Sequence, residues 1–108
     1  MKYLLLIRIN ESEPGPDVLM PAYDEFTDDL QRAGKLVRAD RLLGPASASA
    51  VRVRAGKTLV IDGPYAETKE WLCGAYIVDC RDKPEALAIA ARIPSAPYGT
   101  IEVVPFAD

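Results

Sequence analysis

The stretch DGPYAETKE, residues 62–70, gathers residue types that can do chemistry. Asp62 follows an apolar run and precedes a Gly-Pro pair, which is typical of a turn. If the Asp62 carboxylate faces a partly buried space, burial raises its pKa and Asp62 can act as a general acid or base. If the carboxylate bonds nearby backbone N–H groups instead, it only fixes the turn. The sequence leaves both roles open.

Charged and aromatic residues follow this turn. Glu67 and Lys69 share one face of an extended segment, so they can contact a ligand together or form a solvated ion pair. Tyr65 and Trp71 can be core or dimer-contact aromatics, or they can form a wall on which a planar ligand stacks. These alternatives also stay open.

The histidine and cysteine contents exclude several kinds of site. The chain has no histidine, which removes Ser-His-Asp and Cys-His catalysis and the commonest transition-metal ligand. With only Cys73 and Cys80 available, we expect no metal site and no cofactor. Seven residues along one strand would separate these cysteines by about 23 Å and place them on opposite faces, too far apart for a disulfide. We therefore expect buried, unreactive thiols.

Length and charge limit the class of protein. The chain of 108 residues is 49% hydrophobic, which predicts one folded domain over residues 1–108. A net charge of −3 argues against binding to a nucleic-acid backbone, which needs a basic surface. The apolar run in residues 1–10 is too short for a membrane span or a secretory signal. We therefore expect a cytoplasmic protein with no nucleic-acid or membrane partner.

Alternation over residues 1–9 predicts a strand with two different faces. One face is apolar throughout and should pack against helices. The other is apolar at its centre and charged at its ends, which suggests a sheet that meets a second sheet or lines a cavity. The first face holds Tyr3, Leu5, Ile7 and Ile9, and the second holds Lys2, Leu4, Leu6 and Arg8.

An apolar stripe predicts the first helix, which ends at Gly34. Its start is ambiguous, because Asp17 can be the N-cap or Pro21 can mark the first turn. The stripe consists of Leu19, Tyr23, Phe26, Leu30 and Ala33.

The remaining pattern predicts an α+β fold. Further strands are expected over 35–43, 50–54, 57–62, 72–80 and 100–106, with a second helix over 83–93. Ala55-Gly56 joins two of these strands in a hairpin. Without that hairpin the order is βαββαβ, a ferredoxin-like sheet with two helices on one face. The uncovered, partly apolar face predicts pairing with a second copy in a dimeric α+β barrel.

Charged residues interrupt the predicted strands. Arg8 and Arg38 can converge on the open face of the sheet with Asp40 and Glu102 to form a polar pocket. They can equally sit in water at the strand ends. Arg52 and Arg54 fit the wet face of an exposed hairpin.

The residues of the opening stretch resemble the DGPFAETKE signature of the DGPF-domain proteins, a branch of the YCII-related superfamily. Tyr65 replaces the Phe of that signature. The segments MKYLLLI, AYDEFTDDLQRAG, VRVRAGKTLVIDGP and GAYIVD extend the resemblance over nearly the whole chain. The resemblance implies a dimeric barrel of ferredoxin-like subunits and a largely unassigned function. It also implies genes that often lie beside those of extracytoplasmic-function sigma factors. A His–Asp pair has been proposed for other YCII-like proteins, and this chain cannot form one.

Two functions follow from these observations. The first is a homodimeric module that binds a small molecule or a protein partner, with a link to sigma-factor regulation. The alternative is a small-molecule enzyme that uses Asp62 as acid–base in an inter-sheet pocket. The absence of histidine favours the first, but whether the protein is an enzyme stays undecided. The candidate ligand-binding residues are Arg8, Arg38, Tyr65, Glu67 and Lys69.

Overall fold

The computed structural model describes residues 1–10, 12–63 and 69–107. In chain order, the elements are β1 (Lys2–Ile9), α1 (Pro16–Arg32), β2 (Leu36–Arg41), η1 (Pro45–Ser47), β3 (Ser49–Arg54), β4 (Lys57–Asp62), β5 (Trp71–Asp79), α2 (Lys83–Ala91), η2 (Ala96–Tyr98) and β6 (Gly99–Pro105).

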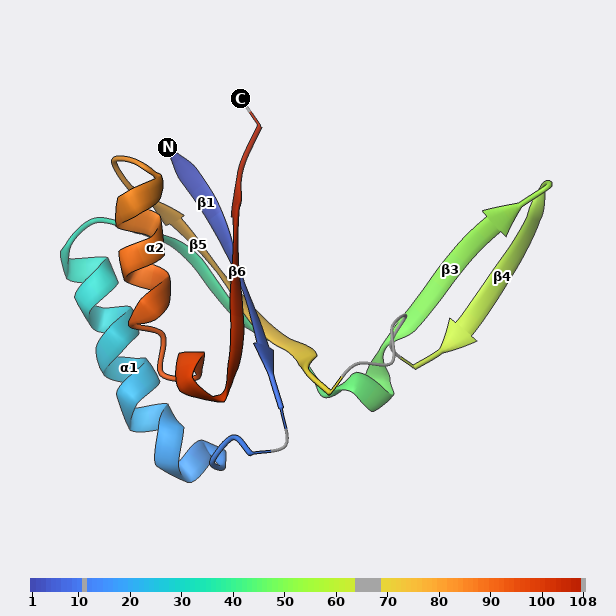
Figure 1. Cartoon of the computed structure of the whole chain (residues 1–108), viewed down its shortest axis with the longest axis horizontal. Coiled ribbons are helices and arrows are strands. Elements are labelled where there is room, and N and C mark those ends of the chain that lie inside the picture. The colour runs from blue at the N-terminus through green and yellow to red at the C-terminus, as the bar shows by residue number, and fades with distance from the viewer. Residues whose placement is uncertain (11, 64–68, 108) are drawn as a thin grey trace.

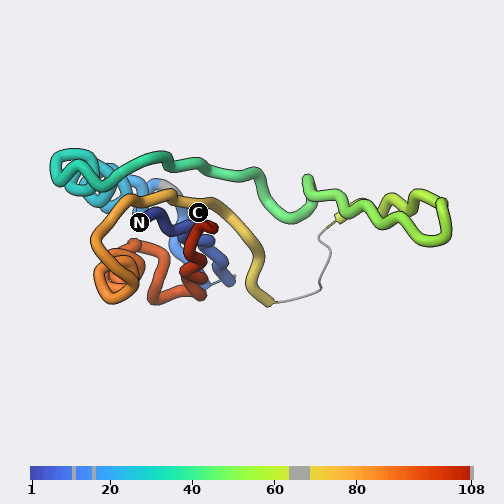
Figure 2. Tube along the Cα trace, turned by 90° about the horizontal axis from the view of Figure 1, so that it is seen from above, coloured from blue at the N-terminus to red at the C-terminus, as the bar shows by residue number. Residues whose placement is uncertain are grey.

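The main sheet is four-stranded and antiparallel, with the order β2-β5-β1-β6. Both helices cover the same face of this sheet (Figure 1). This arrangement confirms the predicted α+β class, and it is compatible with a ferredoxin-like fold. Strands β3 and β4 pair only with each other as a separate two-stranded ribbon, which projects away from the rest of the molecule in both views (Figures 1 and 2).

The central strand β1 has the two different faces that its alternation predicts. Tyr3, Leu5, Ile7 and Ile9 are buried against the helices, and Leu5 is fully buried. Each such side chain contributes roughly 1.5–3 kcal/mol through removal of apolar surface from water. The opposite face of β1 is half-buried. The two helices and the segments beside α2 complete the core with Phe26, Leu30, Ala86, Ile89, Ala90 and Ile93.

Helix α1 begins earlier than the sequence predicts. Gly15 is the N-cap and Pro16 occupies the first turn, so both predicted starts were wrong. Proline is well suited to the first turn, because its missing N–H would have no helical partner there. Pro21 lies inside the helix. The predicted end is confirmed, since Gly34 has a φ of 72° and its N–H donates to the Gln31 carbonyl oxygen. Within the described ranges, no helix combines the length and hydrophobicity needed to cross a bilayer.

A β-bulge in β5 changes the predicted placement of the cysteines. Gly74 pairs with Ile7 and Leu72 pairs with Arg8, which leaves Cys73 as an extra residue between them. A bulge breaks the alternation of side chains, so Cys73 packs against the same core that contains Cys80. The prediction that they lie on opposite faces was therefore wrong. Both cysteines are free, as the predicted lack of a disulfide requires.

One glycine allows the edge strand β6 to approach β1. Gly99 pairs with Ile9, and a Cβ atom added at Gly99 would lie 1.9 Å from the Arg8 carbonyl oxygen. Backbone atoms cannot move aside as a flexible side chain can. The start of β6 therefore requires glycine for space, although its φ of −177° suits any residue.

We expect Gly99→Ala to lower the free energy of unfolding by about 3 kcal/mol, the upper range for overpacked sites. Urea denaturation followed by circular dichroism measures this change. Gly44→Ala is the matched control, because an added Cβ there meets nothing within 4 Å, and we expect a change of about 0.5 kcal/mol at most. Equal stability of the two variants would contradict the close approach of β6 to β1.

Candidate functional site

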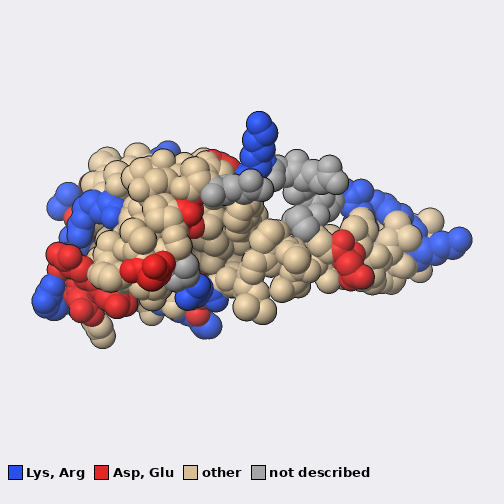
Figure 3. Space-filling model, turned by 90° about the horizontal axis from the view of Figure 1, so that it is seen from below, with Lys and Arg blue, Asp and Glu red and all other residues tan. Residues whose placement is uncertain are grey.

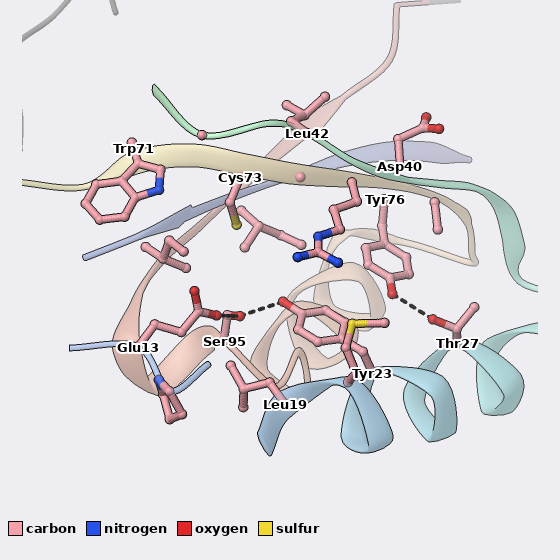
Figure 4. Close-up of a pocket in the computed structure, with 18 of the residues that line it drawn as sticks. Glu13, Leu19, Tyr23, Thr27, Asp40, Leu42, Trp71, Cys73, Tyr76 and Ser95 are labelled. Atoms are coloured by element: carbon pink, nitrogen blue, oxygen red, sulfur yellow. Dashed lines mark hydrogen bonds between the residues drawn. The ribbon is translucent and has the colours of Figure 1, made fainter. Parts of the chain in front are cut away.

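A pocket of about 340 Å³ opens on the helix-facing side of the sheet, between α1 and the neighbouring ends of β2 and β5 (Figure 4). Its volume falls at the small end of the range for ligand sites in proteins. Apolar walls come from β1, α1 and β5, and polar groups enter from α1 and from the loops around residues 13 and 95. The apolar wall includes Ile7, Ile9, Leu19, Met20 and Trp71.

A chain of hydrogen bonds holds a carboxylate in this pocket. The Tyr23 hydroxyl donates to Ser95 Oγ at 2.7 Å, and the Ser95 hydroxyl donates to Glu13 Oε1 (Figure 4). Ser95 is only 1% exposed, so both bonds satisfy a polar group that water does not reach. The chain joins three segments that are distant in sequence, and it fixes Glu13 at the pocket wall.

The direction of this chain follows from the protonation state of Tyr23. Burial raises the pKa of Tyr23 to about 12, although the hydrogen bond to Ser95 opposes this effect. The phenol is therefore protonated near neutral pH and acts as the donor. Ser95 Oγ accepts this hydrogen bond and donates its own hydrogen bond to Glu13, so the carboxylate is the terminal acceptor. The remaining lone pairs of Glu13 can accept a hydrogen bond from a ligand.

Aromatic packing stiffens the floor of the pocket. Tyr23 and Tyr76 stack with ring centroids 6.4 Å apart, and Phe26 meets Tyr76 edge-on at 5.3 Å. The Tyr76 hydroxyl shares a hydrogen bond of 2.7 Å with Thr27 Oγ1. Each ring is thus fixed by packing and, for the tyrosines, by a polar partner. This wall does not need to rearrange to receive a flat or compact ligand.

Cys73 lines the pocket but is not a strong nucleophile. Burial raises the pKa of the Cys73 thiol to about 11, and the nearby charge of Glu13 acts in the same direction. The thiolate, which is the reactive form, is therefore scarce at neutral pH. This agrees with the expectation of an unreactive thiol.

Arg41 brings a positive charge to the same pocket. It lines the pocket at the end of β2, close enough to Cys73 for its charge to lower the thiol pKa against the larger effect of burial. Within the described ranges, Arg41 has no carboxylate at ion-pair distance. Its neighbour Asp40 points away from the cluster and pairs with Arg38 (Figure 4). The guanidinium is therefore available to an anionic ligand.

The predicted acid–base residue Asp62 lies elsewhere. It is the last residue of β4, it is exposed, and it accepts a long hydrogen bond of 3.5 Å from Ser49 Oγ. It is not part of the pocket wall. Gly63 beside it has a φ of 102°, and its N–H donates to the Ala48 carbonyl oxygen at the base of the ribbon. The turn-fixing role and the catalytic role of Asp62 both stay predictions.

Of the other predicted binding residues, Arg8 and Arg38 do not meet. Arg8 pairs with Glu102 at 2.7 Å, and Arg38 pairs with Asp40 at 2.5 Å. Their positions beside Leu72 and Ile77 place the two pairs roughly 17 Å apart along β5. Lys69 is exposed. The predictions for Tyr65 and Glu67 lie outside the described residues.

Sequence reasoning missed the residues that the fold does bring together. Glu13 lies in a Pro- and Gly-rich loop, and Ser95 lies between two prolines, so neither position carries a periodic pattern. Tyr23 was assigned to the apolar stripe of α1. One signal was present, because a tyrosine in a core stripe needs a hydrogen-bond partner for its hydroxyl. The sequence does not say which residue that partner is.

A family model for the YCII-related domain matches residues 1–108. The chain belongs to the YCII-related family. An uncharacterised protein of Rhizobium meliloti (strain 1021) is 46% identical over 77 residues, which make up 69% of this chain and 62% of that relative. The matched chain thus spans less than two thirds of the relative's length.

Family membership confirms the resemblance at the level of the superfamily. Assignment to the DGPF branch stays a prediction, and residues 64–68 of its signature lie outside the described residues. In this YCII-related protein, no group of three or more Cys, Asp or Glu side chains in the described ranges is placed to hold a metal ion.

The raised thiol pKa gives a measurable pH dependence. In a Cys80→Ser variant, which isolates Cys73, we expect slow alkylation by iodoacetamide at pH 7 and a rate that rises toward an apparent pKa of about 11. The same variant unfolded in urea is the control, with an expected pKa of about 8.5. Alkylation of the folded variant with the pKa of the unfolded one would contradict the buried environment of Cys73.

Proposed function

We propose that this YCII-related protein binds a small organic acid in the pocket beneath β2 and β5. The observation that carries the proposal is the Tyr23–Ser95–Glu13 chain, which holds a carboxylate in a pocket that Arg41 also lines. A buried serine, itself bonded to a half-buried tyrosine, fixes the orientation of this carboxylate, as a binding or catalytic site requires.

The two charges define the class of ligand. A guanidinium recognises a carboxylate or similar anion through paired N–H donors. A carboxylate that already accepts from Ser95 recognises a hydroxyl or amine donor on the ligand. The walls between them are aromatic and aliphatic. These features together fit a compact, mostly apolar acid that also carries a hydroxyl or amino group.

A second candidate is an enzyme that transfers a proton on such an acid. A positioned carboxylate beside an anion-binding cation can remove a proton and stabilise the negative charge that develops. In this reading Glu13 is the base and Arg41 stabilises the charge, so the acid–base role passes from Asp62 to a residue in the pocket. The orientation of Glu13 favours this candidate, and turnover of the bound acid would distinguish it from binding alone.

The open face of the sheet supports the expected homodimer. Leu4 pairs in register with Ile77 on one side and Val104 on the other, so these apolar side chains form a row across the sheet. Both helices of the described residues lie on the other face of the sheet, so neither of them covers this row (Figure 1). Two such faces packed together would form the dimeric α+β barrel expected from the sequence, with the ligand pocket on the other side of each sheet.

We expect Arg41→Gln to weaken binding of an aromatic hydroxy acid by about tenfold to a hundredfold, because one charge-assisted interaction is lost. Glu13→Gln should weaken binding of hydroxy acids more than binding of the parent acids without the hydroxyl. Isothermal titration calorimetry measures both effects after a thermal-shift screen of acids and their neutral amides.

Arg38→Gln is the matched control, since Arg38 is an exposed arginine of the same strand outside the pocket. Binding should survive this change. Equal affinity for acids and amides, or equal losses in the Arg41 and Arg38 variants, would contradict the proposed anion site.

We expect Ile77→Lys to convert the homodimer to monomers, because a charge at the centre of the open face opposes pairing of two sheets. Sedimentation velocity measures the change. Leu87→Lys is the control, since Leu87 is 47% exposed on α2. A dimer dissociation constant in the Ile77 variant equal to that of the Leu87 control would show that the open face is not a contact between copies.

A further inference from the structure

The ribbon formed by β3 and β4, residues 49–62, is called the arm here, and the rest of the described chain is called the body. Its backbone pairing runs only between its own strands, from Ser49–Asp62 at the base to Arg54–Lys57 near the tip. Figures 1 and 2 show the arm extending away from the body in two perpendicular views. The arm therefore takes no part in the core described above.

Apolar side chains are exposed on both faces of the arm, and one of these faces also carries Arg52, Arg54 and Lys57. Val51 and Val60 form a cross-strand pair on one face, with exposed fractions of 63% each, and Val53 lies beside them. Leu59 and Ile61 occupy the other face at 51% and 47%. A lone two-stranded ribbon is marginally stable in water, and exposed apolar surface of this kind marks a contact site. In a single chain, the arm thus lacks an apolar surface that would pack against it and stabilise it.

The accessible surface area of the chain is larger than expected for a compact monomer of its mass. Its accessible surface is 7302 Å², whereas a folded monomer of 11.8 kDa has about 5,900 Å². Its radius of gyration is 15.6 Å, compared with about 13 Å for a compact domain of this length. The excess surface is roughly 1,400 Å² per chain, which matches what each partner buries in a stable homodimer of the larger class.

Charge indicates which kind of surface the arm fits. The arm carries Arg52, Arg54 and Lys57 against a single acid, Asp62, and so has a net charge of +2. The body carries twelve Asp and Glu against ten Lys and Arg, a net charge of −2. The other −3 of the chain belongs to Glu11, Glu67 and Asp108, which lie outside the described residues. Figure 3 shows Lys and Arg over the outer end of the arm, and Asp and Glu interleaved with Lys and Arg over the far end of the body. The arm and the body of two different copies are therefore complementary in charge.

We infer that the arm of each protomer packs against the body of a second copy, so that two arms are exchanged reciprocally in one dimer. A two-fold arrangement uses the same contact twice and covers both arms at once. The apolar faces of the arm supply the buried area, and its three cations lie against the acidic body. This contact is additional to the pairing of the open sheet faces, and it does not involve the ligand pocket.

The test removes the apolar surface of the arm without breaking the ribbon. Val51→Lys combined with Val60→Glu places opposite charges directly across from each other, which preserves cross-strand pairing and net charge. Leu87→Lys combined with Ala91→Glu is the matched control, because both residues are exposed on α2 and are spaced one turn apart. Sedimentation velocity over a range of protein concentrations gives the dimer dissociation constant of each variant.

We expect the arm variant to raise the dissociation constant at least about tenfold and the control to leave it within about twofold. Added salt should weaken the wild-type dimer, because the arm contact pairs unlike charges. An arm variant that dimerises like the control would overturn arm exchange while leaving pairing of the sheet faces intact. A wild-type protein that is monomeric throughout would overturn both contacts, and acid binding in the pocket would still be tested separately.

Limited trypsin digestion of the unmodified protein tests the same contact without relying on any variant. Trypsin cleaves after Arg52, Arg54 and Lys57, all in the arm. We expect cleavage at these sites to slow at least about tenfold as the protein passes from monomer to dimer, because the arm becomes buried. Mass spectrometry identifies the cut sites. Cleavage in the arm that does not depend on protein concentration would contradict the inference.

Discussion

The different chemistry of the two faces of β1 is the constraint on which the rest of the structure depends. Tyr3, Leu5 and Ile7 require an apolar layer on one face, and both helices pack there. The strand is bonded on both sides, to β5 and to β6, so its position fixes the whole sheet. The pocket then lies on the helical face, and the row of Leu4, Ile77 and Val104 lies on the other. The proposed ligand site and the proposed dimer contact therefore lie on opposite sides of one layer.

The pocket depends on a small number of buried polar bonds. Ser95 is the residue at which a loop, a helix and the segment before β6 meet, because its hydroxyl accepts from Tyr23 and donates to Glu13. An unbonded hydroxyl at that depth would cost about 1–3 kcal/mol, so each partner needs the others. The cost of burying polar groups is what makes the geometry of the site specific. It also explains why Cys73 in the same pocket stays protonated, since the low polarity of the site disfavours a thiolate.

The arm shows the opposite situation, an element whose local structure is complete while its packing is not. Its pairing is regular over all of β3 and β4, yet its valines are each more than half exposed. Hydrogen bonding between strands specifies a ribbon, but burial of apolar surface is needed to stabilise it. In the proposed dimer, a second copy would supply that burial.

The sequence by itself determined the elements and the α+β class, because alternation and helical periodicity in β1 and α1 reflect local geometry. It also determined that histidine-based chemistry is absent. Only the tertiary structure decided where α1 begins, because several positions near Pro16 are compatible with a helix start. It also decided the side of the sheet on which Cys73 lies, because a one-residue bulge shifts the alternation of side chains and cannot be recognised from that alternation. It likewise decided the site: Glu13, Tyr23 and Ser95 are separated by up to 82 residues, and contacts over that distance come from packing. Asp62 belongs to the stronger sequence motif, but a sequence motif does not say which residues line a pocket. The tertiary structure places the Glu13 carboxylate, and not that of Asp62, at the pocket.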